Sequence, residues 1–357
     1  MSDQAATAYG YPIGIIGCGN IFERYVTGLR QLGGVEIAWC ADLDVPLAEK
    51  MAAKLGIPGS GSPTDALGDQ FGYAGLVVNL TPPAAHAKVA QTALLAGKHV
   101  YIEKPLADTP AAAAEVLSLA ARRGLQVGGA PDWILSSTAQ VAREVINTGR
   151  IGRPVAVSAF ISHSRVEQWH SSPGIFFQPG AGPVLDLGPY YISALTYWLG
   201  PIAEVAALQQ TGLPERRVTA PNRVVESVPV EVATHACALL RFESGPVGTL
   251  TASFEAWERT MPFIEIYGSD GTLNLPMPHE RDGEVRIKLH SDADWTVVPT
   301  PARPYARGIG VVEMAQAVQD AGSPGASGAA AFHVLEVLTA IETSSVERKF
   351  VTLRGSS

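Results

Sequence analysis

Hydrophobic and polar positions alternate with different periods in two parts of the chain. Between residues 13 and 129, short apolar runs alternate with longer stretches of helical periodicity. The apolar runs are residues 13–17, 36–40, 75–80, 99–102 and 125–129, and the helical stretches are residues 22–32, 46–55, 84–96 and 110–123. Short apolar runs flanked by turns are typical of strands buried on both faces. The strand–helix–strand order therefore predicts an α/β domain with a doubly wound parallel sheet.

After residue 131 the runs become longer and richer in β-forming residues. They cover residues 154–164, 204–210, 231–243, 247–257, 262–275 and 284–290, with turn signals at 243–245 and 269–271 that favour antiparallel hairpins. Helical patterns cover residues 185–199, 309–319 and 332–344, and residues 322–330 predict a loop. We expect a first domain at residues 10–130. A second, α+β domain with a large, mostly antiparallel open sheet is expected at residues 131–357.

Composition and charge exclude several classes of protein. A chain of 357 residues with 46% hydrophobic and 17% charged residues is typical of a soluble protein with two domains. The formal charge is −8 and no Lys/Arg block occurs, so we expect no nucleic-acid partner. We also expect no membrane span, because no apolar run reaches ~18 residues. The chain does not start with a basic stretch and an apolar segment, so a cytoplasmic location is predicted.

The three cysteines predict no disulfide framework. Cys18, Cys40 and Cys237 lie far apart in the sequence and form no C-x-x-C pair. Cys18 and Cys40 lie in or beside apolar runs, where a free thiol is typically a small buried hydrophobe. This usage is expected in a reducing compartment.

A glycine-containing turn follows the first apolar run. Its sequence, from residue 17 to residue 22, is GCGNIF, and a helical pattern follows. Glycines are needed where the chain turns tightly and where the backbone approaches a pyrophosphate, and the N-terminus of the next helix offers free N–H groups to an anion. Gly17, Gly19, Asn20 and Ile21 are therefore candidate cofactor-binding residues. Phe22 occupies the position of the third glycine in the usual motif.

An acid at the end of the second run predicts which dinucleotide is bound. Asp42 follows residues 36–40, 23 positions after Gly19. A carboxylate there accepts hydrogen bonds from the ribose hydroxyls and repels a 2′-phosphate. NAD is therefore predicted as the cofactor, with NADP less favoured. Asp44 is an alternative for this contact.

Lys104 lies at the end of an apolar run and directly before a proline. Ligands of open parallel sheets bind outside the carboxyl ends of the strands, and a residue before proline is excluded from helical space. Pro105 also tolerates a cis bond. Beside an oxidised nicotinamide, a second positive charge and partial desolvation would favour the neutral amine of Lys104. We therefore predict Lys104 as the group that takes the proton when a hydride leaves an alcohol carbon.

Further strand-end residues are expected at the same edge of the sheet. Thr81 and Pro82 end one strand and Glu103 ends the next, so all three are candidate cofactor contacts. His86 opens a helix after Thr-Pro-Pro and is either a capping residue or a cofactor contact. An alternative for Lys104 is a surface lysine that pairs with Glu103.

Five segments together resemble the glucose–fructose oxidoreductase, inositol dehydrogenase and MocA (Gfo/Idh/MocA) family. They are IGIIGCGN near the start, NLTPPAAH at 79–86, EKPLA at 103–107, GAGPVLDLGPYY at 180–191 and AFHVLEVLTAIETS at 331–344. The resemblance implies a Rossmann domain, an α+β domain whose open sheet forms homodimers or homotetramers, and NAD(P)-linked chemistry on a sugar or cyclitol. It also implies that Lys104 is the active-site lysine and Asp186 the aspartate that orients the substrate. The two are expected to meet at one nicotinamide face.

The proton acceptor has several candidates. Many relatives have a histidine four residues after the aspartate, where this chain has Tyr190, and Pro189 places Asp186 and Tyr190 in the first turn of a helix, on one face. A phenol, with an ordinary pKa of ~10, needs a cation such as Lys104 to act as a base. Alternatively, Lys104 accepts the proton itself, or Tyr190 packs in the core.

His170 is the third candidate, since a histidine is a base near neutral pH. Trp169 and His170 beside a Pro-Gly loop suit a substrate wall, and His235 is a weaker candidate in a strand. No clustered Cys/His pattern occurs, and the spacing of His163 and His170 does not suit one ion, so no metal is expected. Two functional alternatives remain: an NAD-dependent glycosidase-type enzyme with transient oxidation, and a non-catalytic sensor of NAD and sugars.

Overall fold

The computed structural model describes residues 10–163, 165–258, 260–278, 283–302 and 305–353 of the chain. Its contacts divide the chain into two units. The first is Met1–Leu135 with Arg303–Phe332, and the second is Ser136–Ala302 with His333–Ser357. The expected domain boundaries stay a prediction; the contacts add that a late segment, residues 303–332, packs with the first unit.

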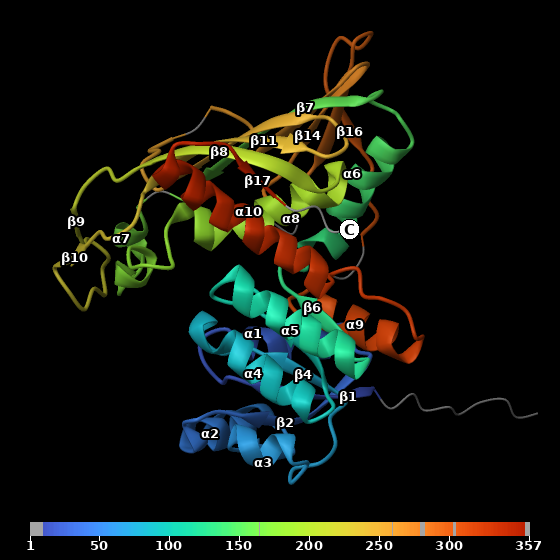
Figure 1. Ribbon diagram of the computed structural model, residues 1–357, viewed down its shortest axis with the longest axis vertical. Coiled ribbons are helices and arrows are strands. Elements are labelled where there is room, and N and C mark those ends of the chain that lie inside the picture. Colours follow the sequence, from blue (N-terminus) through green and yellow to red (C-terminus); the bar gives the residue numbers. More distant parts are fainter. Residues whose placement is uncertain (1–9, 164, 259, 279–282, 303–304, 354–357) are drawn as a thin grey trace, which may run out of the picture. The chain divides into compact units, whose positions relative to one another are not determined.

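A six-stranded parallel sheet forms the centre of the first unit (Figure 1). The strands, in the order β3-β2-β1-β4-β5-β6, are Gly59–Gly61, Val35–Ala41, Tyr11–Ile16, Leu76–Asn79, His99–Ile102 and Val127–Gly129. Within the described residues all pairings of these strands are parallel, and the central strand β4 is buried along its whole length. This order places the carboxyl ends of neighbouring strands β1 and β4 beside each other, which is where a doubly wound sheet binds its ligand.

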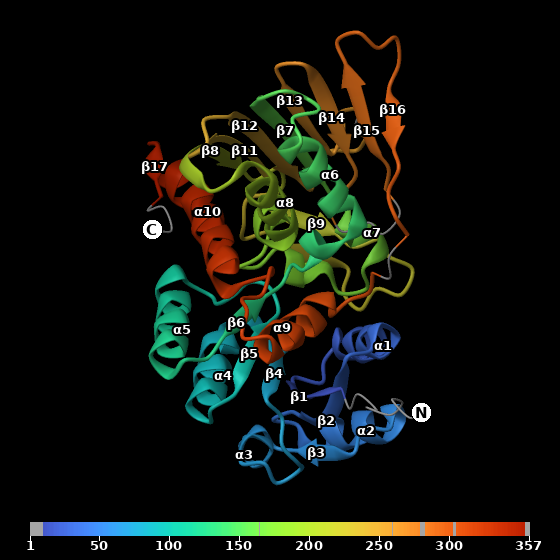
Figure 2. The ribbon, with the colours of Figure 1, turned by 90° about the vertical axis from the view of Figure 1, so that its right-hand side faces the viewer.

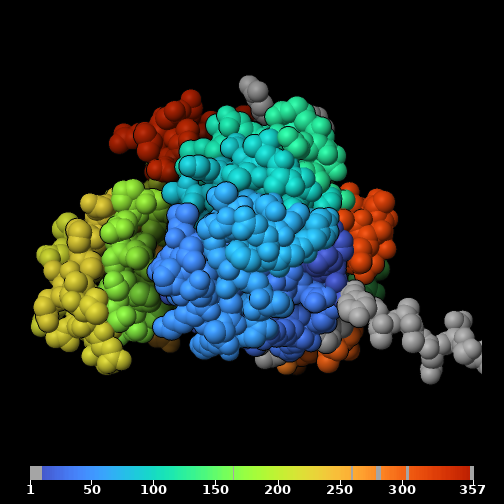
Figure 3. All heavy atoms as spheres, turned by 90° about the horizontal axis from the view of Figure 1, so that it is seen from below, coloured from blue at the N-terminus to red at the C-terminus, as the bar shows by residue number. Residues whose placement is uncertain are grey.

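Helices cover the parallel sheet. They are α1 (Phe22–Leu32), α2 (Val45–Leu55), α3 (Pro63–Leu67), α4 (Pro83–Leu95) and α5 (Pro110–Arg123). Helices α4 and α5 contact each other, and α4 also contacts β4 and β5. Figure 3 shows α2 and α3 in blue beside α4 and α5 in cyan. The predicted bounds of α1 and α5 are confirmed, whereas β3 and α3 were not predicted because both are too short to show a period.

Helix α9 (Ile309–Gln319) belongs to the first unit although it lies late in the chain. It contacts α1, β5 and β6, and its Val311 and Met314 are part of the same core as Ile13 and Leu76. A buried carboxylate fixes its start, because the Gly310 amide donates to Asp132 Oδ2 at 3.1 Å. Burial raises the pKa of Asp132, against the opposing effect of that hydrogen bond.

A nine-stranded sheet dominates the second unit (Figure 2). Its order is β16-β15-β14-β13-β7-β12-β11-β8-β17. The strands are Thr296–Val298, Val285–Leu289, Gly271–Leu275, Ile264–Gly268, Pro154–Ser162, Val247–Ser253, His235–Phe242, Ile202–Gln210 and Val351–Thr352. In the part of the chain that the structure describes, β7–β12 is the one parallel pair of this sheet, which confirms the predicted mostly antiparallel sheet and the fold class.

Helices α6 (Ser137–Asn147), α8 (Pro183–Leu199) and α10 (Gly328–Glu347) lie on one face of this sheet (Figures 1 and 2). Strand β11 alternates accordingly, with Ala236, Ala238 and Leu240 buried and Leu239 and Arg241 exposed. Two short elements, α7 (Val166–Trp169) and the 3-10 helix η2 (Pro173–Phe176), follow β7, and a hairpin of β9 (Glu215–Arg217) and β10 (Ser227–Pro229) follows β8. A second 3-10 helix, η1 (Trp133–Leu135), precedes α6. Assembly through the open face stays a prediction.

Two details of the second unit differ from the sequence predictions. Helix α8 begins at Pro183, so Pro189 lies inside the helix and not in its first turn. The helix starts two residues earlier than predicted because Gly182 is its N-cap, with a φ of 93° that lies outside helical space. The run 231–243 becomes a strand only from His235, because residues 231–234 bond to other segments, as in the Glu231 amide that donates to the Phe177 carbonyl.

Candidate functional site

The glycine turn lies between β1 and α1. Gly17 has a φ of 102°, and a Cβ on it would lie 2.6 Å from the Leu80 carbonyl carbon, so only glycine fits there. Helix α1 has Ile21 as its N-cap with no side-chain cap, and its first amide, that of Phe22, donates to the Gly19 carbonyl at 3.1 Å. The N-terminal turn of a helix is the type of site that binds an anion. A Cβ on Gly19 would meet no described atom within 4 Å. These features fit the pyrophosphate of a dinucleotide, with Asn20 and Ile21 at the helix start.

Phe22 shows why the third glycine is dispensable here. Its side chain is fully buried in the core of the first unit, together with Tyr25, Val26 and Leu29. Helix α1 is therefore held by core packing at this position, where the usual motif has a close glycine contact.

Asp42 follows β2 and faces the turn. Its Oδ2 accepts a hydrogen bond from the Cys18 amide at 2.8 Å, and its Oδ1 accepts one from the Asp44 amide at 3.0 Å. Asp44, the alternative ribose contact, instead caps α2 by accepting from the Leu47 amide. The geometry therefore favours Asp42 for the ribose. Cys18 and Cys40 are buried free thiols.

The ends of β4 and β5 are joined by the His86 ring. Its Nδ1 lies 2.6 Å from the Pro105 carbonyl oxygen and its Nε2 lies 2.7 Å from the Thr81 carbonyl oxygen. Asn79 completes the link, because its Oδ1 accepts from Thr81 and its Nδ2 donates to the His86 carbonyl. His86 is buried and is not the helix cap, which is Pro82. Cofactor contacts by His86, Thr81 and Pro82 stay predictions.

Glu103 organises the segment that carries Lys104. Its Oε1 accepts from the Tyr25 hydroxyl at 3.0 Å and from Arg307 at 2.9 Å, and its Oε2 accepts from the Lys104 amide at 2.7 Å. Burial, and secondarily the Glu103 carboxylate, raises the pKa of Tyr25 well above its ordinary value. The peptide bond between Lys104 and Pro105 is cis. Lys104 is thus held at the carboxyl end of β5 by a carboxylate with three partners.

The candidate residues of the second unit gather around α8. Asp186 lies in its first turn, and Tyr190 follows four residues later, one turn along the same helix. Tyr191 is buried and its hydroxyl donates to the Phe160 carbonyl, so this neighbour is a core residue. The predicted meeting of Lys104 and Asp186 stays a prediction, as does the proton acceptor.

His163, rather than His170, lies beside Asp186. The distance from His163 Nδ1 to Asp186 Oδ2 is 3.8 Å, and this nitrogen is buried with no hydrogen-bond partner among the described residues. The His170 Nδ1 accepts a hydrogen bond from the Ser172 amide. The sequence held a signal for His163, because it lies near the end of the predicted run 154–164, but this histidine was considered only as a metal ligand with His170.

An aromatic cluster surrounds His163. The Trp169 indole stacks on it with centroids 5.2 Å apart, while Phe176 and Phe254 approach it edge-on. His170 packs edge-on against Trp169 and Phe176. Trp169 remains 51% exposed, so the cluster presents a large aromatic surface. We call these residues, His163, Trp169, His170 and Phe176, the aromatic wall.

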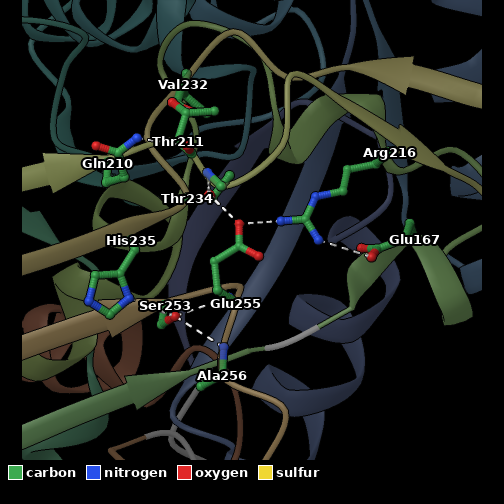
Figure 4. Close-up of polar contacts among 11 residues, drawn as sticks. Glu167, Gln210, Thr211, Arg216, Val232, Thr234, His235, Ser253, Glu255 and Ala256 are labelled. Atoms are coloured by element: carbon green, nitrogen blue, oxygen red, sulfur yellow. Dashed lines mark hydrogen bonds and ion pairs between the residues drawn. The ribbon is translucent and has the colours of Figure 1, made fainter.

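The structure also shows the position of His235 and bears on metal binding and membrane spans. His235 lies in β11, where its Nδ1 is 3.0 Å from the Ser253 hydroxyl, a contact within the sheet (Figure 4). Within the part of the chain that the structure describes, no three His, Cys, Asp or Glu side chains form a group that could hold a metal ion. None of its helices has the length and apolar character to cross a membrane.

Family models match both halves of the chain. The model described as "Oxidoreductase family, NAD-binding Rossmann fold" matches residues 12–129, and the "GFO/IDH/MocA C-terminal domain" matches residues 139–274. The chain therefore belongs to the Gfo/Idh/MocA family, as its sequence motifs predicted. Its first unit is an NAD-binding Rossmann domain, which confirms the predicted cofactor class.

Two of the similar proteins have names that refer to a sugar or sugar derivative. Levoglucosan dehydrogenase of Pseudarthrobacter phenanthrenivorans is 28% identical over 64% of this chain and 63% of its own length. The 1,5-anhydro-D-fructose reductase of Ensifer adhaerens is 25% identical over 88% of this chain and 90% of its own. An NAD binding oxidoreductase from Klebsiella pneumoniae has a solved structure with a TM-score of 0.83 and 26% identity, covering 97% of this chain and 100% of that one. The match to levoglucosan dehydrogenase thus spans about three fifths of that enzyme.

Proposed function

We propose that this protein is an NAD(P)-dependent oxidoreductase that transfers a hydride between nicotinamide and a secondary alcohol or carbonyl carbon of a sugar, sugar derivative or cyclitol. The observation that carries the proposal is Lys104, held at the carboxyl end of β5 by the Glu103 carboxylate. An amine at that edge of a Rossmann sheet can take the proton that an alcohol loses as its carbon gives up a hydride. The names of the relatives support a sugar as the substrate.

Different residues of the chain would bind the cofactor, accept the proton and orient the substrate. NAD, when bound, supplies the hydride acceptor. Gly17, the α1 N-terminus and Asp42 would hold its pyrophosphate and adenosine ribose. We assign Lys104 as the proton acceptor, with Tyr190 as a hydrogen-bonding partner of the substrate. Asp186 orients the substrate hydroxyls.

The aromatic wall supports a ring substrate. A pyranose or cyclitol has faces of C–H groups that pack on aromatic rings and edges of hydroxyl groups that need polar partners. Trp169 offers an exposed indole, and His163 and Asp186 offer polar atoms within 3.8 Å of each other. We therefore add His163 to the substrate-binding residues, beside the predicted His170.

The test is a panel of pyranoses, sugar derivatives and cyclitols, assayed with NAD⁺ and with NADP⁺ by absorbance of the reduced cofactor. We expect NAD⁺-dependent oxidation of at least one compound. Glycoside cleavage without accumulation of NADH would instead indicate the transient-oxidation class. Tight NADH binding with no turnover across the panel would indicate a sensor.

A further inference from the structure

Two long connections of the second unit are bound to each other. Residues 165–182 join β7 to α8, and residues 211–234 join β8 to β11. The amides of Thr219 and Ala220 donate to the Glu167 carbonyl, and the Val224 amide donates to the Ser171 carbonyl. Figures 1 and 3 show α7, in green, beside β9 and β10, in yellow. The two connections, here called the paired connections, therefore form one structural layer.

A buried arginine joins the paired connections to the sheet. Arg216, on β9, donates from Nη1 to Glu167 Oε1 at 3.3 Å and from Nη2 to Glu255 Oε1. Its side chain is only 8% exposed, and Figure 4 shows the guanidinium between the two carboxylates. We call Arg216, Glu167 and Glu255 the Arg216 clasp. The planar, forked guanidinium lets one cation bond to two acids from different segments at once.

Glu255 anchors the clasp to the sheet. It follows β12, and its amide donates to the Ser253 hydroxyl at 3.0 Å. Its Oε1 also accepts from the Thr234 hydroxyl, just before β11 (Figure 4). Gly212 leaves the space for this carboxylate, because a Cβ there would lie 2.4 Å from Glu255 Oε1. The carboxylate therefore has a fixed position relative to two central strands.

The clasp holds the aromatic wall from two sides. Glu167 lies in α7, two residues before Trp169, and Glu255 directly follows Phe254. Phe254 packs edge-on against His163 and Phe176, and the Arg216 guanidinium lies 5.8 Å from the centroid of the Phe177 ring. A change in the clasp would therefore move Trp169 and Phe176 relative to His163.

We propose that Arg216 is a positioning residue that sets substrate affinity and selectivity by fixing the aromatic wall around His163. The proposal rests on the proposed function and names the part of the second unit that selects the ring. Removal of Arg216 would leave the nearly buried Glu167 carboxylate and the partly exposed Glu255 carboxylate without their cation, and a buried charge without a partner is strongly destabilising. The paired connections would separate, and the stacking surface for a sugar ring would lose its fixed geometry.

The test compares Arg216→Met with Arg216→Lys and with Arg223→Met. Arg223 pairs with Glu226 in the same connection but is exposed, so it is a matched control that should behave as the unmodified protein. For Arg216→Met we expect the KM of the best sugar to rise about tenfold or more, with kcat within about threefold and NADH affinity unchanged. Arg216→Lys keeps the positive charge but lacks the planar guanidinium. Its KM should therefore lie between those of the unmodified protein and of Arg216→Met.

Hydrogen exchange gives a readout that needs no turnover. Faster exchange is expected in Arg216→Met at the amides of Thr219, Ala220, Val224 and Glu231, which bond across the paired connections. Amides of the parallel sheet should exchange as before. If Arg216→Met does not fold, Arg216→Lys carries both measurements.

Three results would overturn the proposal. The first is an unchanged KM in a folded variant with Arg216 replaced, and the second is unchanged exchange at these amides. The third is an equal loss of sugar affinity and NADH affinity, because such a result indicates a general loss of structure. Absence of sugar turnover by the unmodified protein contradicts the proposed function instead. The exchange measurement then still decides whether Arg216 holds the paired connections.

Discussion

The two units hold their acidic side chains in different ways. In the first unit, carboxylates at strand ends bond to backbone amides: Asp42 accepts from the Cys18 and Asp44 amides, and Glu103 accepts from the Lys104 amide beside its contacts with Tyr25 and Arg307. In the second unit, the clasp joins Arg216 to acids 49 and 39 residues away. The parallel sheet thus builds its site from the ends of strands, and the antiparallel sheet builds its site from the packing of long connections.

The two candidate sites therefore depend on different interactions for their geometry. A strand end is fixed by the sheet register, so the position of Lys104 follows from β5 and from the exclusion of a residue before proline from helical space. The aromatic wall has no such register, because α7 and η2 are short and lie between β7 and α8. Side-chain networks must supply the rigidity there, and they are the more sensitive to single substitutions.

The largest effect is expected at the strand end of the first unit. Lys104→Met removes the proposed proton acceptor, so kcat should fall by roughly 10²–10⁴-fold, the usual contribution of a general base. NADH should bind as before, because the methionine keeps most of the side-chain volume. Stopped-flow turnover measures kcat, and fluorescence titration measures the affinity for NADH.

Lys88→Met is the control for this prediction. Lys88 is exposed on α4, so its replacement should leave kcat unchanged. Retained activity in Lys104→Met would remove Lys104 as the base and leave Tyr190 or a histidine of the aromatic wall in that role.

A second prediction concerns the Asp42 carboxylate. Asp42→Ser should raise the KM for NAD⁺ about tenfold and lower the preference for NAD⁺ over NADP⁺, because the carboxylate would no longer bind the ribose hydroxyls or repel a 2′-phosphate. Asp44→Ala should cost about 1 kcal/mol of stability as a lost helix cap, with an unchanged preference. Preference of the unmodified protein for NADP⁺ would contradict the assignment.

A third prediction separates the two histidines of the aromatic wall. His163→Asn should raise the KM for the sugar about tenfold, the equivalent of one lost hydrogen bond to a polar substrate group, without a change in NADH affinity. His290→Asn, at an exposed position, is the control. A larger effect from His170→Asn than from His163→Asn would show that the sequence prediction named the right residue.

The smallest effect is expected in the core of the second unit. The buried His333 accepts a hydrogen bond on Nε2 from the Ile202 amide, and burial lowers its pKa, although Glu243 opposes the shift. Because the folded pKa lies below the unfolded value, the stabilisation is present above about pH 6.5 and is lost as the pH falls.

The variant His333→Gln keeps a hydrogen-bond acceptor for the Ile202 amide but has no group that titrates. Between pH 7.5 and 5.5 the unmodified protein should lose more stability than the variant, measured by urea unfolding at the two pH values. His99, whose pKa burial also lowers, is present in both proteins and cancels in the comparison. Parallel pH curves for the two proteins would show that His333 does not titrate in this range.

Sequence patterns were sufficient where a local rule decides the structure. The apolar runs and glycine turn predicted β1, α1, β2 and β5, because strand ends and turns depend on neighbouring residues. Helix α6 was not predicted, although Ser136 caps it, and α9 was expected with the second domain. Its attachment to the first unit depends on Asp132 and on buried contacts that no local pattern shows.

The sequence by itself determined the family, the parallel sheet of the NAD-binding domain with its glycine turn, and the strand-end position of Lys104. Only the tertiary structure showed that His163 lies beside Asp186 and that Arg216 joins three segments. The physical reason is the range of the interactions involved. Backbone rules act over a few residues, whereas ion pairs and ring contacts are made by whichever residues the folded chain brings together.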